Sequence, residues 1–103
     1  MPPCLRARRC KYAAENDKAA ASAVQKAFEE VQAQVKAVDG LASVQRVVCG
    51  GCLDFKIIIS VEESKFGAWE EASFAPEADF IAAIEKIDGV TQVETQTYTL
   101  ATL

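Results

Sequence analysis

The sequence contains no histidine among its 103 residues. This absence removes every arrangement in which an imidazole activates a serine or cysteine nucleophile, and every metal site that needs a histidine ligand. We therefore predict a protein that works by binding, that is not an enzyme and that carries no cofactor. A long apolar run is absent too, because no stretch approaches the roughly 20 residues that a membrane-spanning helix requires.

Basic residues are fewer than acidic ones, 11 against 15, and the net charge is -4. Four of the positive charges lie in the first eleven residues, at Arg6, Arg8, Arg9 and Lys11. The acidic remainder argues against a nucleic-acid groove. We expect residues 1–15 to form a basic N-terminal segment or an irregular edge strand rather than the remnant of an organelle-targeting sequence.

One pattern occurs twice: an apolar helical stripe, an Asp-Gly pair and then a strand. The copies span residues 28–48 and 80–100, with the Asp-Gly pairs at 39–40 and 88–89. Between them, residues 53–62 alternate apolar and polar side chains as a half-buried strand does. This order predicts a ferredoxin-like α+β fold of the split βαβ (βαββαβ) kind, a four-stranded antiparallel sheet with two helices on one face. Residues 1–103 are long enough for one such domain.

The first helix is predicted over residues 17–38, and further strands over 44–49 and 91–100. The apolar face of that helix comprises Val24, Phe28, Val31, Val35 and Val38. The strand that should precede it is the weak element, because residues 2–13 alternate poorly. We predict that this first strand is irregular or missing, and that a partner can supply the deficient edge.

Because the helices cover one face only, the other face of the sheet must be exposed to solvent, bound to a ligand or buried by another subunit. Residues 63–75 form a long connection with three aromatic rings, which either docks a partner or closes the core as a short helix. We predict a protein partner, as a homo-oligomer or a larger assembly. The expected contact residues are Ile58, Ser60, Phe66, Trp69, Gln96 and Tyr98.

From residue 43 onward, VQRVVCGGCLDFKIIISV and IDGVTQVETQTYTL resemble the ACT-like effector-binding domain of the leucine-responsive and asparagine regulators. Gly51 and Asp54 match the family's Gly-x-x-Asp turn before its third strand. The resemblance implies assembly through the sheets and an amino-acid-type ligand near Gly51 and Asp54.

The segment VEESKFGAWEE is similar to the nucleotide-exchange domain of translation elongation factor one-beta, which is also ferredoxin-like. Dimeric α/β-barrel proteins share the same fold. The predicted function is a non-catalytic association module that uses its open sheet face and the Trp69 segment. The alternatives are a small-molecule sensor domain and an exchange domain for a translation GTPase.

Four cysteines are the sharpest chemical feature of the chain. Cys49 and Cys52 form a CxxC motif, and with Cys4 and Cys10 they suffice for a tetrahedral thiolate zinc site. The alternative is a pair of half-buried hairpin residues, joined as a disulfide in an oxidising compartment. A thioredoxin-type redox role is disfavoured, because this motif enters a strand and not the start of a helix.

Overall fold

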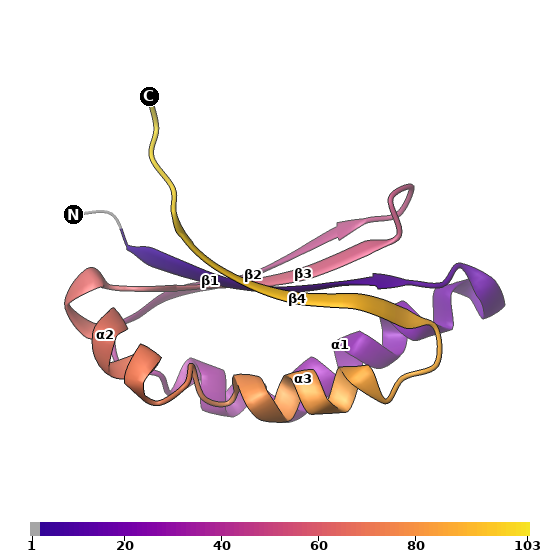
Figure 1. Cartoon of the computed structure of the whole chain (residues 1–103), viewed down its shortest axis with the longest axis horizontal. Coiled ribbons are helices and arrows are strands. Elements are labelled where there is room, and N and C mark those ends of the chain that lie inside the picture. The colour runs from indigo at the N-terminus through magenta and orange to yellow at the C-terminus, as the bar shows by residue number, and fades with distance from the viewer. Residues whose placement is uncertain (1–2) are drawn as a thin grey trace.

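The computed structural model describes residues 3–103 and confirms the ferredoxin-like architecture (Figure 1). The chain order is β1 (Cys4–Tyr12), α1 (Glu15–Lys36), β2 (Leu41–Cys49), β3 (Asp54–Val61), α2 (Glu63–Glu71), α3 (Glu77–Glu85) and β4 (Val90–Thr99). The strands form one antiparallel sheet in the order β2-β3-β1-β4. The predicted helix and strands agree with these bounds to within a few residues.

All three helices lie on one face of the curved sheet, and no element of the described chain covers the other face (Figure 1). The core lies between the layers, where Phe28 of α1 meets Phe80 of α3 edge to face at 5.8 Å between ring centroids. From β3 it takes Phe55, Ile57, Ile59 and Val61, all at most 3% exposed. Burial of these alternating side chains explains why residues 53–62 were recognisable as a strand.

The prediction for the first strand is wrong: β1 is a continuous nine-residue strand at the centre of the sheet, paired with β3 and β4. The part of residues 1–15 that forms β1 is therefore not an irregular edge, and residues 1–2 lie outside the described residues. The alternation was obscured because Arg6 and Arg8 point toward the helices, into the face that apolar residues usually fill. The apolar Leu5 and Ala7 are buried on the opposite face.

The two Asp-Gly pairs end the turns after α1 and α3 in the same way. Gly40 and Gly89 have φ of +82° and +91°, a conformation that glycine adopts without steric cost. A Cβ on Gly40 would lie 2.5 Å from Cβ of Lys65, so α2 also packs too closely here for a side chain. These turns place each following strand back on the sheet.

Within residues 3–103, no helix has the length and apolar character needed to cross a membrane.

Candidate functional site

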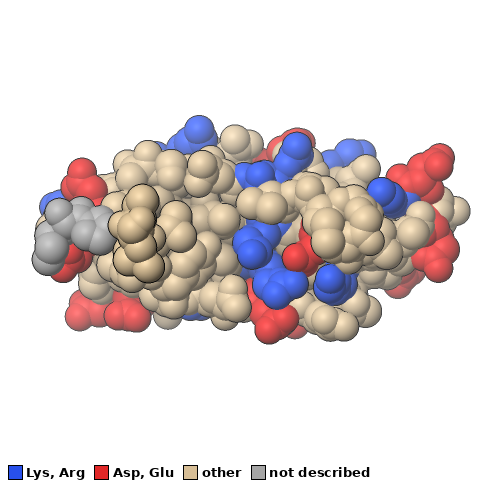
Figure 2. All heavy atoms as spheres, turned by 90° about the horizontal axis from the view of Figure 1, so that it is seen from above, with Lys and Arg blue, Asp and Glu red and all other residues tan. Residues whose placement is uncertain are grey.

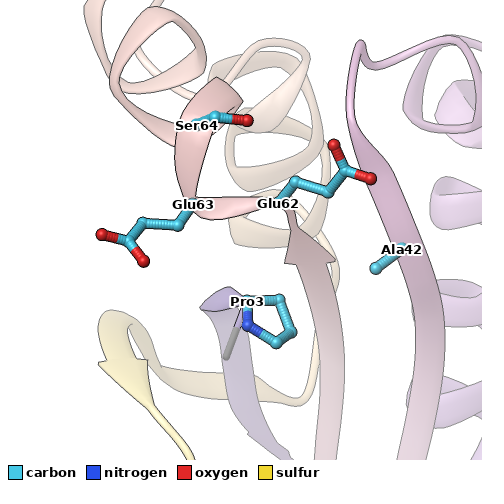
Figure 3. A pocket seen from close by; sticks show the side chains of 5 residues that line it. All are labelled: Pro3, Ala42, Glu62, Glu63 and Ser64. Atoms are coloured by element: carbon cyan, nitrogen blue, oxygen red, sulfur yellow. The ribbon is translucent and has the colours of Figure 1, made fainter. Parts of the chain in front are cut away.

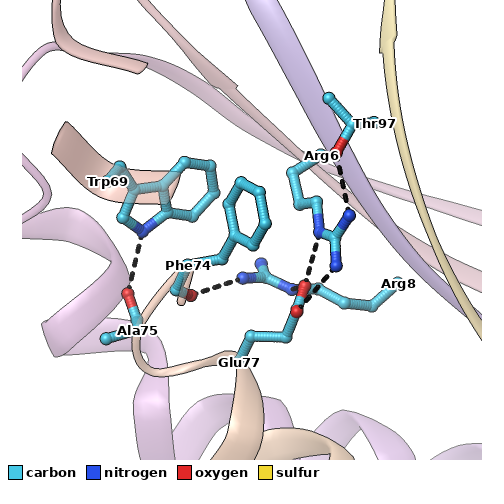
Figure 4. Close-up of polar contacts among 7 residues, drawn as sticks. All are labelled: Arg6, Arg8, Trp69, Phe74, Ala75, Glu77 and Thr97. Carbon is cyan, nitrogen blue, oxygen red and sulfur yellow. Dashed lines mark hydrogen bonds and ion pairs between the residues drawn. The ribbon is translucent and has the colours of Figure 1, made fainter. Parts of the chain in front are cut away.

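Two arginines of β1 meet one carboxylate under the helices (Figure 4). Nε and Nη2 of Arg6 donate to the two carboxylate oxygens of Glu77 at 2.8 and 2.9 Å. Nε of Arg8 donates to Oε1 of the same carboxylate at 3.0 Å. Arg6 also reaches the neighbouring strand β4, where its Nη1 donates to Oγ1 of Thr97 at 2.8 Å. We call Arg6, Arg8, Glu77 and Thr97 the arginine cluster.

The charged side chains of the arginine cluster are largely withdrawn from water and carry an unbalanced charge. The side chains of Arg8, Glu77 and Arg6 are 2%, 11% and 15% exposed. Burial lowers the pKa of Arg8, while the negative charge of Glu77 opposes that shift. A guanidinium nevertheless stays protonated in proteins. One carboxylate therefore faces two cations, and one positive charge is left without a partner inside the cluster.

Aromatic rings of the α2–α3 corner form a wall beside these charges. The guanidinium of Arg6 lies 4.0 Å from the ring centroid of Phe74, and that of Arg8 lies 5.5 Å from the ring of Trp69. Nη2 of Arg8 donates to the carbonyl of Phe74 at 3.1 Å, and Nε1 of Trp69 donates to that of Ala75 at 3.0 Å. The first bond fastens the corner to β1, and the second ties α2 to the turn that follows it.

The arginine cluster is closed on the side of the helices, around Arg8 and Glu77. The space between Arg8, α1 and the start of α3 leaves no volume for a water molecule. Ser73 and Phe74, in the turn between α2 and α3, have φ of 58° and 56°. Residues other than glycine rarely adopt this left-handed backbone conformation, which costs about 1–3 kcal/mol per residue. The corner that covers the cluster is thus a strained part of the helix layer, as is the first turn of α1, where Asn16, Asp17 and Lys18 have φ of 57°, 56° and 61°.

An open hollow lies elsewhere, at the end of the sheet where α2 begins (Figure 3). It has a volume of about 610 Å³ and is lined by Pro3, Ala42, Glu62, Glu63 and Ser64. The two carboxylates flank it from the solvent-exposed start of α2. It holds neither a buried charge nor an aromatic ring, so it offers less chemistry than the arginine cluster.

Four of the predicted contact residues do lie together on the open sheet face. In the strand register, Ile58 and Gln96 both pair with Ala7, whereas Ser60 and Tyr98 both pair with Leu5. Figure 2 looks onto this face: basic side chains gather near its middle, with carboxylates among them. The basic residues of this face are Arg9, Lys11 and Lys56, and the acidic ones are Asp54 and Glu94.

The remaining predicted contact residues lie on the other side of the sheet. Phe66 and Trp69 are only 8% and 6% exposed, in the helix layer. Their rings pack against Phe74, with centroids 5.7 and 5.1 Å away. The docking-arm interpretation of residues 63–75 is therefore wrong, because α2 turns its aromatic rings inward and closes the core.

The two residues predicted to bind a ligand, Gly51 and Asp54, are not part of the arginine cluster. Gly51 is exposed in the β2–β3 hairpin, and the carboxylate of Asp54 accepts two hydrogen bonds of 3.1 Å from Nη2 of Arg9. Their proposed role toward an amino-acid-type ligand stays a prediction.

The zinc prediction is not supported. Cys49 and Cys52 are joined in a disulfide, which consumes two of the four thiols. Cys4 and Cys10 lie near the two ends of β1, about 20 Å apart at the usual rise of a strand. Among the described residues, no group of three or more potential ligands comes together around a metal-sized space.

Sequence reasoning missed the arginine cluster entirely. Arg6 and Glu77 are separated by 71 positions in the chain, so no local pattern joins them. One signal was available: Arg6 and Arg8 stand two positions apart where the βαββαβ order calls for a first strand, and a regular strand places both on one face. A buried pair of this kind demands a carboxylate from another element.

Solved structures share this fold over nearly the whole chain. A candidate antibiotic biosynthesis monooxygenase from Deinococcus radiodurans matches with a TM-score of 0.70 and 15% identity, over 97% of this chain and 94% of that one. A cofactor-independent oxygenase from Streptomyces nogalater matches with a TM-score of 0.66 and 12% identity, over 100% and 97%. A dimeric ferredoxin-like protein from an uncultured marine organism matches with a TM-score of 0.66 and 10% identity, over 100% and 91%.

No protein-family model matches the sequence, and the comparison with curated proteins finds no match. At such low identities the solved structures establish the fold alone, and they do not confirm the regulator or elongation-factor resemblance. They do overturn the prediction of a non-catalytic association module that is not an enzyme. That prediction rested on the missing histidine, whereas structures of this fold include a cofactor-independent oxygenase and a candidate monooxygenase.

Proposed function

We propose that the protein binds an anionic aromatic small molecule at the arginine cluster and oxidises it with molecular oxygen. The observation that carries this proposal is the shared carboxylate: two buried guanidinium groups, Arg6 and Arg8, face the single Glu77. The unpaired positive charge suits a phenolate or enolate oxygen, and the rings of Phe74 and Trp69 suit an aromatic body.

The chemistry of such a reaction fits a site without histidine. If no cofactor supplies electrons, the substrate must donate them to oxygen itself, which an ionised phenol does far more readily than a neutral one. A buried positive charge favours the ionised form and lowers the pKa of a bound phenol. The two guanidinium groups would thus promote loss of the proton by stabilising the resulting anion.

A hydroxyanthrone illustrates the balance of atoms. Its ring methylene loses two hydrogens, the oxygen molecule is split, one oxygen atom becomes the ketone and the other leaves as water. The four electrons come from the substrate and reduce the oxygen molecule completely. Arg6 and Thr97, at the more exposed side of the arginine cluster, would hold the anionic oxygen of the substrate.

Entry of a substrate requires movement, because the cluster is closed. We propose that the corner over residues 72–76 swings outward and that the substrate oxygen replaces the Glu77 carboxylate on Arg6. The left-handed Ser73 and Phe74 make the closed conformation of this corner unfavourable, so its opening would release backbone strain.

Oxygen uptake with 1,8-dihydroxyanthrone tests the proposal directly. The wild-type protein should accelerate oxygen consumption and anthraquinone formation above the buffer rate without an added cofactor. Arg6→Gln should lower that acceleration by at least about tenfold, since one lost charge-assisted hydrogen bond is worth roughly 1.5–3 kcal/mol. Arg46→Gln is the matched control: this arginine is exposed, and its Nη1 donates to Oε1 of Gln25 at 2.9 Å on the α1–β2 side.

Binding can be followed separately, because Trp69 is the only tryptophan of the chain. Its fluorescence should be quenched by the anthraquinone product in the wild-type protein and in Arg46→Gln. Glu77→Gln should bind the anionic product more tightly, since a competing carboxylate is removed. Oxygen uptake at the buffer rate together with unquenched fluorescence would refute the proposed function.

We also propose that the open sheet face pairs with a second copy of this chain. Ile58 and Tyr98 are half-buried there beside the buried Leu5, although no element of residues 3–103 covers them. One solved structure with this fold is described as dimeric. Pairing of two such faces would remove this apolar area from water.

A further inference from the structure

The CxxC motif lies at the tip of the β2–β3 hairpin, which projects beyond the sheet away from the helix layer (Figure 1). Its two cysteines, Cys49 and Cys52, form a disulfide. Cys52 is exposed, whereas Cys49 is half-buried. An attacking thiol therefore has freer access to the sulfur of Cys52.

The surroundings of the two sulfur atoms differ in a second way. The backbone N–H of Cys52 donates to Sγ of Cys49 at 3.0 Å. The hydroxyl of Tyr12 holds the carbonyl of Cys49 at 3.3 Å, so the half-buried cysteine is also tied to β1. A thiolate released at Cys49 would find a hydrogen-bond donor already in place.

Two ammonium groups reach into the same hairpin from different elements. Nζ of Lys11, on β1, donates to the carbonyl of Cys52 at 3.1 Å, and Nζ of Lys18, on α1, donates to that of Gly50 at 3.4 Å. The nearby carboxylate of Asp54 is occupied by Arg9. The charges held at the backbone of the hairpin tip are therefore positive, and a positive charge nearby stabilises a thiolate.

We propose that the Cys49–Cys52 disulfide is a thiol–disulfide exchange site with a fixed direction of attack. An incoming thiolate bonds to Sγ of Cys52, the bond between the two cysteines breaks, and its electron pair leaves on Sγ of Cys49. A second thiolate of the reductant then attacks the mixed disulfide and releases Cys52. The reductant is oxidised to a disulfide, and the hairpin gains two electrons and two protons.

The partner class is a thiol reductant, and two sources share this chemistry: a small thiol such as glutathione, and a protein dithiol of the thioredoxin kind. Separate incubations of the oxidised protein with each reductant distinguish them. Tryptic cleavage after Arg46 and Lys56 isolates both cysteines in one peptide, apart from Cys4 and Cys10. Mass spectrometry of that peptide gives the redox state of the hairpin.

The direction of attack is tested with single-cysteine variants exposed to oxidised glutathione. Cys49→Ser, which keeps the exposed Cys52, should accumulate a stable mixed disulfide at Cys52. In the fully reduced wild type, iodoacetamide should alkylate Cys49 at a rate that levels off at lower pH than the rate of Cys52. Quenching the reaction of the oxidised wild type with glutathione should trap glutathione on Cys52 rather than on Cys49.

Lys18→Gln should slow alkylation of Cys49 at pH 7.5 by about threefold or more, as expected for loss of a nearby positive charge. Lys36→Gln, at the far end of α1, is the matched control and should leave the rate unchanged. Glutathione trapped on Cys49, or a hairpin disulfide that neither reductant reduces in the folded protein, would overturn the proposal and make the disulfide a structural cross-link. These readouts are independent of oxygen uptake.

Discussion

Arg8 and Arg9 are neighbours in the chain but lie on opposite faces of the sheet, and their environments differ. Arg8 points under the helices, is 3% exposed and shares Glu77 with Arg6. Arg9 points to the open face and has Asp54 to itself, with side chains that are 26% and 21% exposed. The covered face thus holds two cations on one carboxylate in a closed space, whereas on the open face Arg9 has a carboxylate of its own nearer to water.

The difference indicates where function is to be sought. A paired charge near water contributes little to stability and little to recognition, typically under about 1 kcal/mol. A buried charge without a full complement of partners lowers the stability of the fold, and such charges are concentrated at functional sites. The same comparison predicts that substitutions on the covered face cost the fold more than substitutions on the open face.

The largest effect is expected in the core under the helices. Phe28→Ala or Phe55→Ala should lower the free energy of unfolding by about 3–5 kcal/mol, because each removes a buried ring that its neighbours cannot replace. The two side chains are 5% and 3% exposed. Urea unfolding followed by circular dichroism measures the loss. A loss below about 1 kcal/mol at both positions would show that the covered face is not the core.

The fold was predictable because its signals are local. The Asp-Gly pairs follow α1 and α3, and the alternation from Asp54 to Val61 marks β3, so these elements are recognisable within a few residues. The arginine cluster was not predictable in this way. It joins β1 to the start of α3 across 71 positions, and its buried charges disguised the strand that carries them.

The cysteines show a different limit. Four thiols in one sequence are compatible with zinc, with a disulfide or with free side chains, and spacing alone does not choose among these chemistries. The structure excludes the four-thiolate zinc site, because β1 separates Cys4 from Cys10 along an extended strand. The hairpin then brings only Cys49 and Cys52 together.

An intermediate loss of stability is expected at high pH, through the buried thiol of Cys10 on the covered face. Burial, and then the charge of Asp54, raise the pKa of this thiol from 9.0 to about 11, while Arg9 partly opposes them. Between these values the folded protein holds a proton that the unfolded chain has lost. The contribution of Cys10 to the free energy of unfolding is therefore fully present below pH 9. It is lost as the pH rises toward 11, by about 2–3 kcal/mol at most.

Unfolding free energies of the wild type and of Cys10→Ala, measured from pH 8 to 11, isolate this contribution. The variant should be less stable at pH 8, because it leaves a small cavity, but its curve should fall less steeply above pH 9. Parallel curves for the two proteins would mean that Cys10 titrates as an exposed thiol does, contrary to its 1% exposure.

The smallest effect on the fold is expected at Ile58, on the open face. Ile58→Asp should change the free energy of unfolding of the monomer by about 1 kcal/mol or less, the span of strand preferences at partly exposed positions. Its effect on association should be far larger, because a carboxylate buried without a partner between two sheets is strongly unfavourable. Light scattering after size exclusion should then report a dimer for the wild type and a monomer for Ile58→Asp.

Ala82→Asp, on the exposed side of α3, is the control: it introduces the same charge and should remain dimeric. A wild-type chain that stays monomeric at high micromolar concentration would remove the second copy from the open face. The covered face would then carry the proposed chemistry within a single chain, because the arginine cluster is complete without a partner.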